Sequence, residues 1–324
     1  MDMSTKKEKI LVTGAGGFIG HHMVRFLKDK GYWVRGVDIK EPDYSSINEA
    51  DEFLLLDLRV PENALKATKG IDKVYNYAAN MGGVGFIENV RADIMHDSVL
   101  INANVVHACK ENRVKRVFYS SSACVYPLSK QTDAAVTALK ESDAYPANPD
   151  TEYGWEKIFS ERLFSSFATD YGLEVRIARY HNIFGPEGTY DGGREKAPAA
   201  ICRKVAQTKN GEEIEIWGDG EQTRSFCYID DCLEGTYKLM ESDCKTPLNI
   251  GSDRLISINQ LVEMIAKIAG KKLKIKHLLD KPQGVRGRNS DNTLLRKTLN
   301  WEPKISLEDG FAKTYDWISK ELAK

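Results

Sequence analysis

The segment that most restricts the fold of this chain is Thr13-Gly14-Ala15-Gly16-Gly17-Phe18-Ile19-Gly20. An apolar stretch precedes this segment, and residues 18–30, which begin within it, carry apolar side chains at helical spacing. A strand that turns through glycines into a helix needs Gly14 for the tight turn, Gly17 for close approach of a ligand to the backbone, and Gly20 for helix–strand packing. The segment therefore predicts a strand–turn–helix unit whose helix N-terminus offers N–H groups to an anion.

The first half of the chain repeats this alternation of short apolar strands and amphipathic helices. Such alternation implies parallel strand pairing with right-handed crossovers, so that helices cover both faces of the sheet. The nearly continuous apolar character of the strands agrees with burial on both faces. We therefore expect an α/β fold with a doubly wound parallel sheet. Its expected elements are strands at 9–13, 33–38, 53–56, 73–79, 114–120 and 174–180, and helices at 18–30, 93–112 and 153–171.

The pattern changes after Asn182, where glycine, proline and charged residues become common. We expect the chain to form two parts, residues 1–182 and a smaller C-terminal α/β lobe at 183–324, with some crossing of the chain between them. The lobe should pack over the strand ends, where ligands of such sheets bind. Its expected elements are helices at 199–208, 230–241, 257–269 and 307–322 and a strand at 213–217.

Charge and hydropathy exclude several kinds of partner. Lys and Arg number 46 and Asp and Glu number 47, so the net charge is −1, without the basic excess that nucleic acid or a membrane surface requires. No apolar run reaches the ~18 residues of a membrane span, and residues 1–8 are polar, unlike a signal peptide. The cysteines and histidines show no zinc-binding spacing, so no metal is expected. We expect a cytoplasmic protein with free thiols.

The strand at 33–38 ends in Asp38, 24 residues after Gly14. A carboxylate at this place accepts hydrogen bonds from both ribose hydroxyls and repels a 2′-phosphate, which favours NAD over NADP. The alternative is a plain glycine turn followed by a solvated aspartate. Asp57 and Leu58 end the third strand and are expected near the adenine, although aspartate is also a common turn residue. The other expected cofactor contacts are Phe18, Ile19, Ala78, Tyr153 and Lys157.

A second chemical signal is the pair Tyr153 and Lys157, four residues apart on an expected helix and hence on one face. A nearby ammonium favours the phenolate, so Lys157 is expected to lower the pKa of Tyr153 from its ordinary ~10. Such a tyrosine can accept a hydroxyl proton while a hydride leaves for NAD. Ser120-Ser121-Ser122 ends the fifth strand, where a hydroxyl can orient this transfer. The alternative is a solvated helix face.

The glycine segment, the serine-terminated strand and the Tyr-x-x-x-Lys pair together resemble the extended short-chain dehydrogenase/reductase family, over essentially the whole chain. The resemblance implies a Rossmann fold with a triad of Ser122, Tyr153 and Lys157. It implies that NAD is kept as a recycled cofactor, and many members act on nucleotide sugars. NAD is then assigned to residues 1–182 and the substrate to 183–324. A homodimer is also implied. The apolar faces of helices 93–112 and 153–171 are candidates for its interface, although helices that only cover a sheet have similar faces.

Cys124 lies two residues after Ser122, so on an extended strand the two side chains face the same side. A thiol, with an ordinary pKa of ~8.5 that a nearby cation lowers, can act as an acid or base near neutrality. The alternative is a small buried cysteine. Residues 192–198 place Arg194, Glu195 and Lys196 between glycines and a proline, a composition that usually marks a solvated loop.

Several longer motifs are similar to those of GDP-sugar epimerases within this family. They are residues 80–83, 122–124, 153–157, 193–198, 217–226 and 284–292. The resemblance implies that Cys124 and Lys196 form an acid/base pair; Cys124 is expected to be the base, with the direction left open. It implies that Arg288, Lys204 and Asn182 hold the nucleoside diphosphate sugar, whose guanine rests on the resemblance alone. The other implied substrate contacts are Gly82, Ser122, Ala123, Cys124, Glu195, Lys196, Ala197, Gln222 and Arg224.

Three alternatives remain open at this point. A nucleotide-sugar 4-epimerase of the same family needs Tyr153 and NAD but leaves Cys124 and Lys196 without roles. A 4,6-dehydratase is disfavoured, because that class carries an Asp-Glu pair directly after the position of Cys124, where this chain has Val125-Tyr126. A non-catalytic NAD-binding protein on the same fold commonly lacks the Tyr/Lys pair, which is present here.

Overall fold

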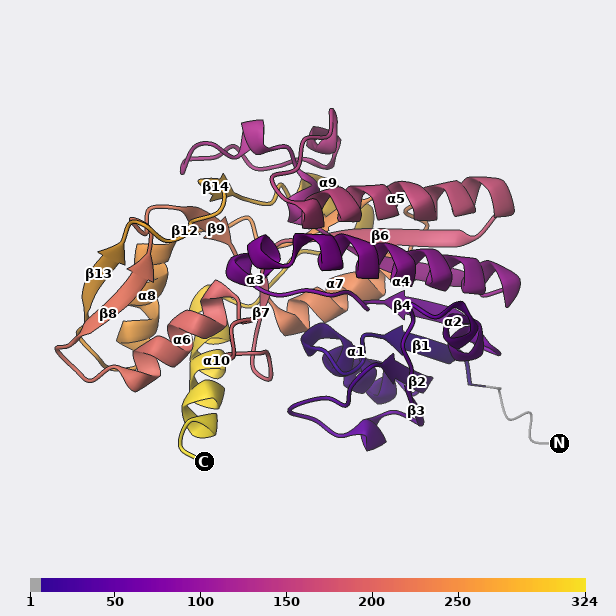
Figure 1. Ribbon diagram of the computed structural model, residues 1–324, viewed down its shortest axis with the longest axis horizontal. Helices are drawn as coiled ribbons and strands as arrows, with labels where there is room; N and C mark the ends of the chain where they lie inside the picture. The colour runs from indigo at the N-terminus through magenta and orange to yellow at the C-terminus, as the bar shows by residue number, and fades with distance from the viewer. Residues whose placement is uncertain (1–6) are drawn as a thin grey trace.

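The described part of the chain, residues 7–324 of a computed structural model, is built around a seven-stranded sheet (Figure 1). Its strands are β1 (Lys9–Thr13), β2 (Trp33–Asp38), β3 (Glu52–Leu55), β4 (Lys73–Asn76), β5 (Arg116–Ser122), β6 (Glu174–Tyr180) and β11 (Leu248–Ile250). All neighbours pair in parallel, in the order β11-β6-β5-β4-β1-β2-β3. The expected doubly wound α/β fold is therefore confirmed. Residues 1–6, which carry part of the expectation about the N-terminal segment, lie outside the described residues.

Helices cover both faces of this sheet. One face carries α2 (Pro61–Thr68), α4 (Arg91–Glu111) and α5 (Glu152–Tyr171), which pack against one another (Figure 1). The other face carries α1 (Phe18–Asp29) and α7 (Ile229–Glu241), which are also in contact. Coverage on both sides buries β1 along almost its whole length, which explains its unbroken apolar sequence.

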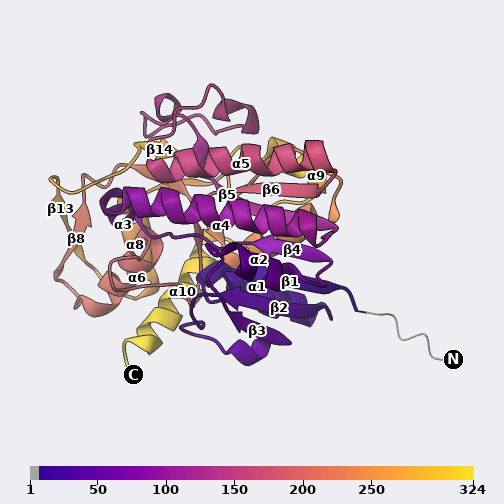
Figure 2. The ribbon, with the colours of Figure 1, turned by 45° about the vertical axis from the view of Figure 1, so that its right-hand side comes forward.

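The second half of the chain adds small sheets and the remaining helices (Figure 2). The sheets pair β7 (Ile183–Phe184) with β10 (Cys227–Tyr228), β8 (Glu213–Trp217) with β13 (Lys274–Leu278), and β9 (Thr223–Ser225) with both β12 (Leu255–Ser257) and β14 (Gly287–Arg288). The helices are α3 (Val84–Asn89), α6 (Ala197–Gln207), α8 (Ile258–Ile268), α9 (Thr293–Leu299) and α10 (Leu307–Glu321). α6, α8 and α10 pack together on the left of Figure 1. Within residues 7–324, no helix is long and apolar enough to cross a membrane.

The chain crosses between its two halves. α7 and β11 both follow residue 182, yet α7 packs on β6, and β11 extends the central sheet beside β6. One buried apolar cluster also contains residues of both halves, such as Val12 from β1 and Phe311 from α10. The two parts therefore share a core, and we retain their division at residue 182 as a proposal about where the two ligands bind.

The predicted long elements agree closely with the observed ones, and the short elements account for the differences. The strand expected at 73–79 ends at Asn76. The Tyr77 N–H still donates to the Thr13 carbonyl at 3.3 Å, whereas the Ala78 N–H donates to the Thr13 hydroxyl at 3.2 Å. The helices α2, α3 and α9, the strand β13 and the strands of two or three residues were not predicted. Such short strands contain too few side chains for a periodic pattern.

A buried ion pair joins α5 to the sheet. Glu161 on α5 and Arg179 on β6 are almost wholly buried, and their closest nitrogen–oxygen distance is 2.7 Å. The Glu161 carboxylate also accepts a hydrogen bond from Ser121 on β5, and Arg179 donates one to the Glu141 carbonyl. Because both charges are buried, removal of either partner would leave an uncompensated charge in the core.

We expect Arg179→Met to lower the free energy of unfolding by about 3–5 kcal/mol, because the substitution leaves Glu161 without its partner. The matched control is Arg254→Met, which breaks an exposed pair with Glu308 at 2.6 Å and should cost no more than ~1 kcal/mol. Urea titrations followed by circular dichroism measure both losses. Equal losses for the two variants would show that the buried pair does not anchor α5.

Candidate active site

The glycine loop lies where the sheet changes its winding direction. β1 has β2 on one side and β4 on the other, so the loop after β1 opens at the carboxyl edge, where doubly wound sheets bind ligands. Gly14 has φ +68°, and a Cβ there would lie 2.8 Å from the Ala78 nitrogen. A Cβ on Gly20 would lie 2.0 Å from the Gly14 oxygen. These restrictions shape the backbone of residues 14–17, the glycine cradle, so that a pyrophosphate fits in front of the N-terminus of α1. The first residues of α1, Phe18 and Ile19, pack on the core.

Asp38 closes β2 beside this cradle. Its Oδ2 accepts a hydrogen bond from Gly16 N at 2.9 Å, and its Oδ1 accepts one from Ile39 N at 2.7 Å. Burial raises the pKa of Asp38, and the surrounding N–H donors act in the opposite direction. A Cβ on Gly16 would lie 2.4 Å from Lys40 O, a restriction that the sequence analysis did not assign. The fixed carboxylate fits the ribose hydroxyls of NAD.

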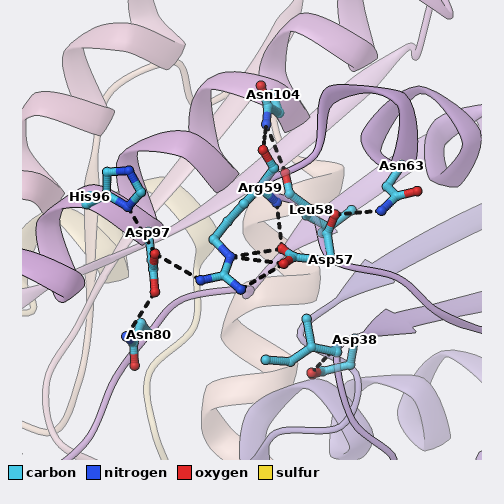
Figure 3. Close-up of polar contacts among 10 residues, drawn as sticks. Asp38, Asp57, Leu58, Arg59, Asn63, Asn80, His96, Asp97 and Asn104 are labelled. Carbon is cyan, nitrogen blue, oxygen red and sulfur yellow. Dashed lines mark hydrogen bonds and ion pairs between the residues drawn. The ribbon is translucent and has the colours of Figure 1, made fainter.

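Asp57 and Leu58 follow β3 and lie near Asp38 (Figure 3). Arg59 binds the Asp57 carboxylate through two nitrogens, at 3.0 and 2.7 Å, and hydrogen bonding from Arg59 holds the pKa of Asp57 below its ordinary value. Arg59 also pairs with Asp97 of α4 at 3.0 Å. The Leu58 side chain is buried. The Asp57 carboxylate thus already has a partner, and contact of Asp57 and Leu58 with adenine remains a prediction.

Ser122, Tyr153 and Lys157 come together from two elements. Ser122 ends β5, while Tyr153 lies in the first turn of α5 and Lys157 lies one turn further on. The Lys157 ammonium is 5.5 Å from the centre of the Tyr153 ring. Lys157 Nζ donates a hydrogen bond to Ser120 O at 3.0 Å, which ties α5 to the end of β5. The arrangement allows the predicted redox roles, which remain predictions.

The electrostatics of this set differ from the expectation. Burial raises the pKa of the Tyr153 hydroxyl above its ordinary value, and a hydrogen bond with Ser122 offsets only part of the rise. Burial also lowers the pKa of Lys157. The prediction that Lys157 brings the Tyr153 pKa below its ordinary value is wrong for the chain alone, because both groups lie where water is excluded and charge is penalised. Bound NAD supplies the hydride acceptor and, in its oxidised form, a positive ring.

Cys124 lies in the 3-10 turn Ala123–Val125 that follows β5. Ser122 caps this turn, because its Oγ accepts a hydrogen bond from Cys124 N at 3.2 Å. The strand does not extend to Cys124 as expected, so the capped turn, and not strand alternation, orients the thiol. Arg288 Nη1 donates to Cys124 Sγ at 3.1 Å, and Cys124 packs beside Tyr153. The thiol therefore lies between the tyrosine and a buried cation.

Lys196 reaches the same region from the second half of the chain. It is the N-cap residue of α6, and the loop before it packs on the loop after β4, where Gly83 N donates to Arg194 O at 3.0 Å. Burial lowers the pKa of Lys196, Cys124 acts to raise it, and Lys157 acts to lower it further. The ammonium group of Lys196 is therefore within electrostatic reach of both the thiol and the second lysine.

Two arginines reach this region from neighbouring strands. Arg224 on β9 and Arg288 on β14 are register partners in a parallel pairing. Burial, together with the nearby Arg288, lowers the pKa of Arg224 to about 9. Arg288 Nη2 lies 3.6 Å from Asp150, whereas Arg224 forms no ion pair in the part of the chain that the structure describes. Two guanidinium groups with so little compensating charge fit an anionic ligand such as a diphosphate.

Most of the remaining predicted substrate contacts have partners within the protein, and their contact with a substrate remains a prediction. Lys204 Nζ donates to Glu215 O at 2.8 Å, and Asn182 Nδ2 donates to Ser225 O at 2.9 Å. Gln222 is buried, and its Oε1 has no hydrogen-bond partner among residues 7–324, so it keeps a free acceptor. The others are Ala123 in the turn that carries Cys124, Ala197 at the start of α6, Gly82 beside Phe86, and Glu195, which binds Arg203.

Two close contacts within this site depend on glycines, Gly154 and Gly287, that were not predicted to have a role. A Cβ on Gly154 would lie 2.3 Å from Cys124 O, so α5 approaches the thiol-bearing turn only because no side chain intervenes. A Cβ on Gly287 would lie 2.1 Å from Asp133 O, which restricts the strand that carries Arg288. Gly154 lies within a helix, where glycine costs ~1 kcal/mol relative to alanine. That cost is the signal that could have identified it.

A possible metal-binding cluster within residues 7–324 consists of His21, His22 and Glu187. Glu187 already pairs with His21 at 3.0 Å and with the Arg25 guanidinium. Burial lowers the pKa of His22 to about 3. The Glu187 carboxylate is therefore already paired with a cation, and the cluster carries no argument for a metal site.

A glycine cradle at the switch point of a parallel sheet, an acidic residue ending β2, and a Ser, Tyr and Lys set between β5 and α5 define the class of protein: an NAD-binding protein of the short-chain dehydrogenase/reductase type. The chain belongs to the NAD dependent epimerase/dehydratase family, whose model matches residues 10–251.

Individual relatives refine this assignment. The chain is 50% identical to GDP-mannose 3,5-epimerase of Arabidopsis thaliana over 317 residues. The matched region covers 98% of this chain and 83% of the relative. Its fold is similar to that of UDP-glucose 4-epimerase from Thermotoga maritima with UDP-glucose, at a TM-score of 0.86, 26% identity and coverage of 97% and 99% of the two chains. UDP-glucuronic acid 4-epimerase from Bacillus cereus, in complex with UDP-glucuronic acid and NAD, gives a TM-score of 0.82 at 28% identity, with coverage of 97% and 99%.

We expect Gly14→Ala to weaken NAD binding by about tenfold or more, because a side chain at this positive φ would displace the cradle from the Ala78 backbone. The matched control is Gly172→Ala at the end of α5, where φ is +69° and no atom lies within 4 Å of the added Cβ. Both variants carry similar backbone strain, but only the first changes the cradle. Calorimetric titration with NAD measures the difference, and equal affinities would contradict the assignment.

Proposed function

We propose that this protein epimerises GDP-D-mannose at C3 and C5 through a transient 4-keto sugar, which gives GDP-L-galactose and GDP-L-gulose. The observation that carries the proposal is that Cys124 packs beside Tyr153 and interacts electrostatically with Lys196, which comes from the other half of the chain. The relative named GDP-mannose 3,5-epimerase, 50% identical over 98% of this chain, supports the choice of substrate. A 4-epimerase would need no such pair.

The reaction explains why a redox set and an acid/base pair belong together. A proton on C3 or C5 of a hexose is not acidic, but a ketone at C4 makes both positions α to a carbonyl. In the proposed mechanism Tyr153 accepts the C4 hydroxyl proton, and NAD held by the glycine cradle and Asp38 would supply the hydride acceptor. Because C4 is first oxidised and then reduced again, the reaction has no net oxidation.

Inversion at C3 or C5 needs a base on one face of the ring and an acid on the other. In our assignment Cys124, as the thiolate, removes the α-proton and leaves an enolate, and the Lys196 ammonium returns a proton to the opposite face. Burial lowers the pKa of Lys196, which makes its ammonium a better proton donor near neutrality. The same two groups act at the other of the two carbons, C3 or C5, once the sugar ring has turned to bring that carbon between them.

The cationic strands are assigned to the diphosphate. The planar guanidinium groups of Arg224 and Arg288 can each donate two parallel hydrogen bonds to phosphate oxygens. Lys204 and Asn182 are assigned to the same ligand. Arg288 also contacts Cys124 Sγ, so the anion site and the acid/base pair share a residue. The proposal takes guanine as the base from the similarity to the Arabidopsis relative.

We also propose that the protein acts in the cytoplasm as a homodimer. All six cysteines are free, which suits a reducing compartment. Trp155 and Phe159 lie one turn apart on α5 and are 42% and 50% exposed. Large apolar side chains on one exposed helix face are typical of a subunit contact, here with α4 and α5 of a second copy.

Turnover in D2O tests the function. With GDP-mannose and no added reductant, we expect deuterium at C3 and C5 of the recovered sugar, together with GDP-L-galactose or GDP-L-gulose. Cys124→Ala and Lys196→Ala should each lower this exchange by about 100-fold or more. Cys244→Ala, at a partly exposed cysteine outside the site, is the matched control and should leave exchange unchanged.

Two other outcomes would contradict the proposal. Absence of exchange from GDP-mannose, with inversion at C4 of a UDP-sugar, would identify a 4-epimerase and leave Cys124 without a role. Tight NAD binding without turnover of any nucleotide sugar would identify a non-catalytic NAD-binding protein.

The dimer has its own test. We expect Phe159→Glu to convert the protein from dimer to monomer, because a buried unpaired carboxylate is costly in an apolar interface. The control is Leu279→Glu, at an apolar side chain that is 70% exposed and lies outside α4 and α5. Light scattering after size-exclusion chromatography measures the mass of both, and a wild-type monomer would overturn the assignment.

A further inference from the structure

Glu156 is a buried carboxylate for which the proposed reaction has no use. It precedes Lys157 on α5, and it is 0% exposed. Its Oε1 accepts hydrogen bonds from Asn102 Nδ2 at 2.8 Å and from Ser160 Oγ at 2.7 Å. Its Oε2 has no hydrogen-bond partner among the described residues and lies 4.0 Å from Lys157 Nζ. A carboxylate in such a place is costly unless it balances a charge.

A chain of hydrogen bonds holds this carboxylate in place. Ala78 N donates to Thr13 Oγ1 at 3.2 Å, and Thr13 Oγ1 donates to Asn76 Oδ1 at 2.7 Å. Asn76 Nδ2 then donates to Asn102 Oδ1 at 2.9 Å, and Asn102 donates to Glu156. Each of these bonds points toward α5, so Glu156 Oε1 must accept, and it accepts from both Asn102 and Ser160. These bonds fix the carboxyl group, while its second oxygen, Oε2, is left to face Lys157.

We propose that Glu156 is a positioning residue that acts through Lys157: its carboxylate is the buried counter-ion of the Lys157 ammonium, and the hydrogen-bond chain from the cradle keeps it there. The other acid on this side of α5, Glu161, is bound to Arg179. The groups that face Lys157 are Tyr153, Glu156 and Glu161 on α5, Tyr119 and Ser120 on β5, Cys124 in the turn after β5, and Lys196 before α6.

Charge balance is the physical reason for this arrangement. Burial lowers the pKa of Lys157, and Glu156 acts against that lowering. Lys196 adds a second ammonium near enough to interact with the first. Without the Glu156 carboxylate, Lys157 would lose its proton at a lower pH, and Tyr153 would lose the cation that favours its phenolate.

Thermal unfolding without cofactor or substrate tests the counter-ion directly. Glu156→Gln keeps the size and the Oε1 acceptor but removes the charge. We expect its Tm to lie about 5 °C below that of the wild type at about pH 6.5, and the deficit to shrink toward about pH 9.5. The sign follows because a lower folded pKa of Lys157 lets the variant release this proton as the pH rises, which removes the cost of a lone buried ammonium. A deficit independent of pH would overturn the proposal.

The same substitution in a Lys157→Met background separates charge from packing. No ammonium remains there, so Glu156→Gln should raise the Tm by removing an unpaired buried carboxylate. An equal loss of Tm in both backgrounds would make Glu156 purely structural and refute the proposal. The matched control is Ser160→Ala, which removes a donor to Glu156 Oε1 but keeps the charge, and whose deficit should not vary with pH.

An activity measurement extends the test and rests on the proposed function. With GDP-mannose as substrate, the alkaline limb of the kcat–pH profile should move down by about one pH unit or more in Glu156→Gln. Wild-type protein that does not turn over GDP-mannose would refute the proposed function and leave the unfolding result standing. Wild-type turnover with an unshifted limb in Glu156→Gln would refute this inference alone.

Discussion

The direct contact between α5 and the turn after β5 is the constraint on which the site depends. Gly154 has no side chain, so the α5 backbone lies against the Cys124 carbonyl, where a Cβ would approach to 2.3 Å. This contact brings Tyr153 and Lys157 to the end of β5, and a buried ion pair with β6 holds the middle of the same helix. Tyr153, Lys157 and the Cys124 thiol therefore keep fixed positions relative to each other, which the proposed chemistry at adjacent carbons of one sugar requires.

Burial controls the electrostatics of this site. It raises the pKa of Tyr153, lowers those of Lys157 and Lys196, and contributes most to the lowering of the Arg224 pKa to about 9. Without ligands, each of these pKa shifts disfavours the charged form of the side chain. A diphosphate would compensate the arginines, and oxidised NAD would bring a positive ring to the tyrosine, so the acid–base properties of the site depend on its ligands. Glu156 is the compensating charge that the chain itself provides for Lys157.

The sequence predicted the cofactor-binding half of the fold better than the other half. The strands at 9–13, 33–38 and 174–180 occur at the predicted bounds, because long apolar runs between glycine and polar residues mark their own ends. β7 and β14 contain two residues each and carry no such pattern. The raised pKa of Tyr153 was also missed, because burial depends on packing and not on the nearest charged neighbour in the sequence.

Residues close along the chain decide the order of strands and helices, the glycine cradle and the chemical types of side chain available, since backbone freedom and hydrophobic period are local properties. Which distant residues meet follows from the packing of the whole sheet. Arg288 contacts Cys124 across 164 positions of sequence, and Glu156 receives its hydrogen bond from Asn102 across 54. No local pattern reveals such pairs, because they depend on how strands and helices from both halves of the chain pack into one core.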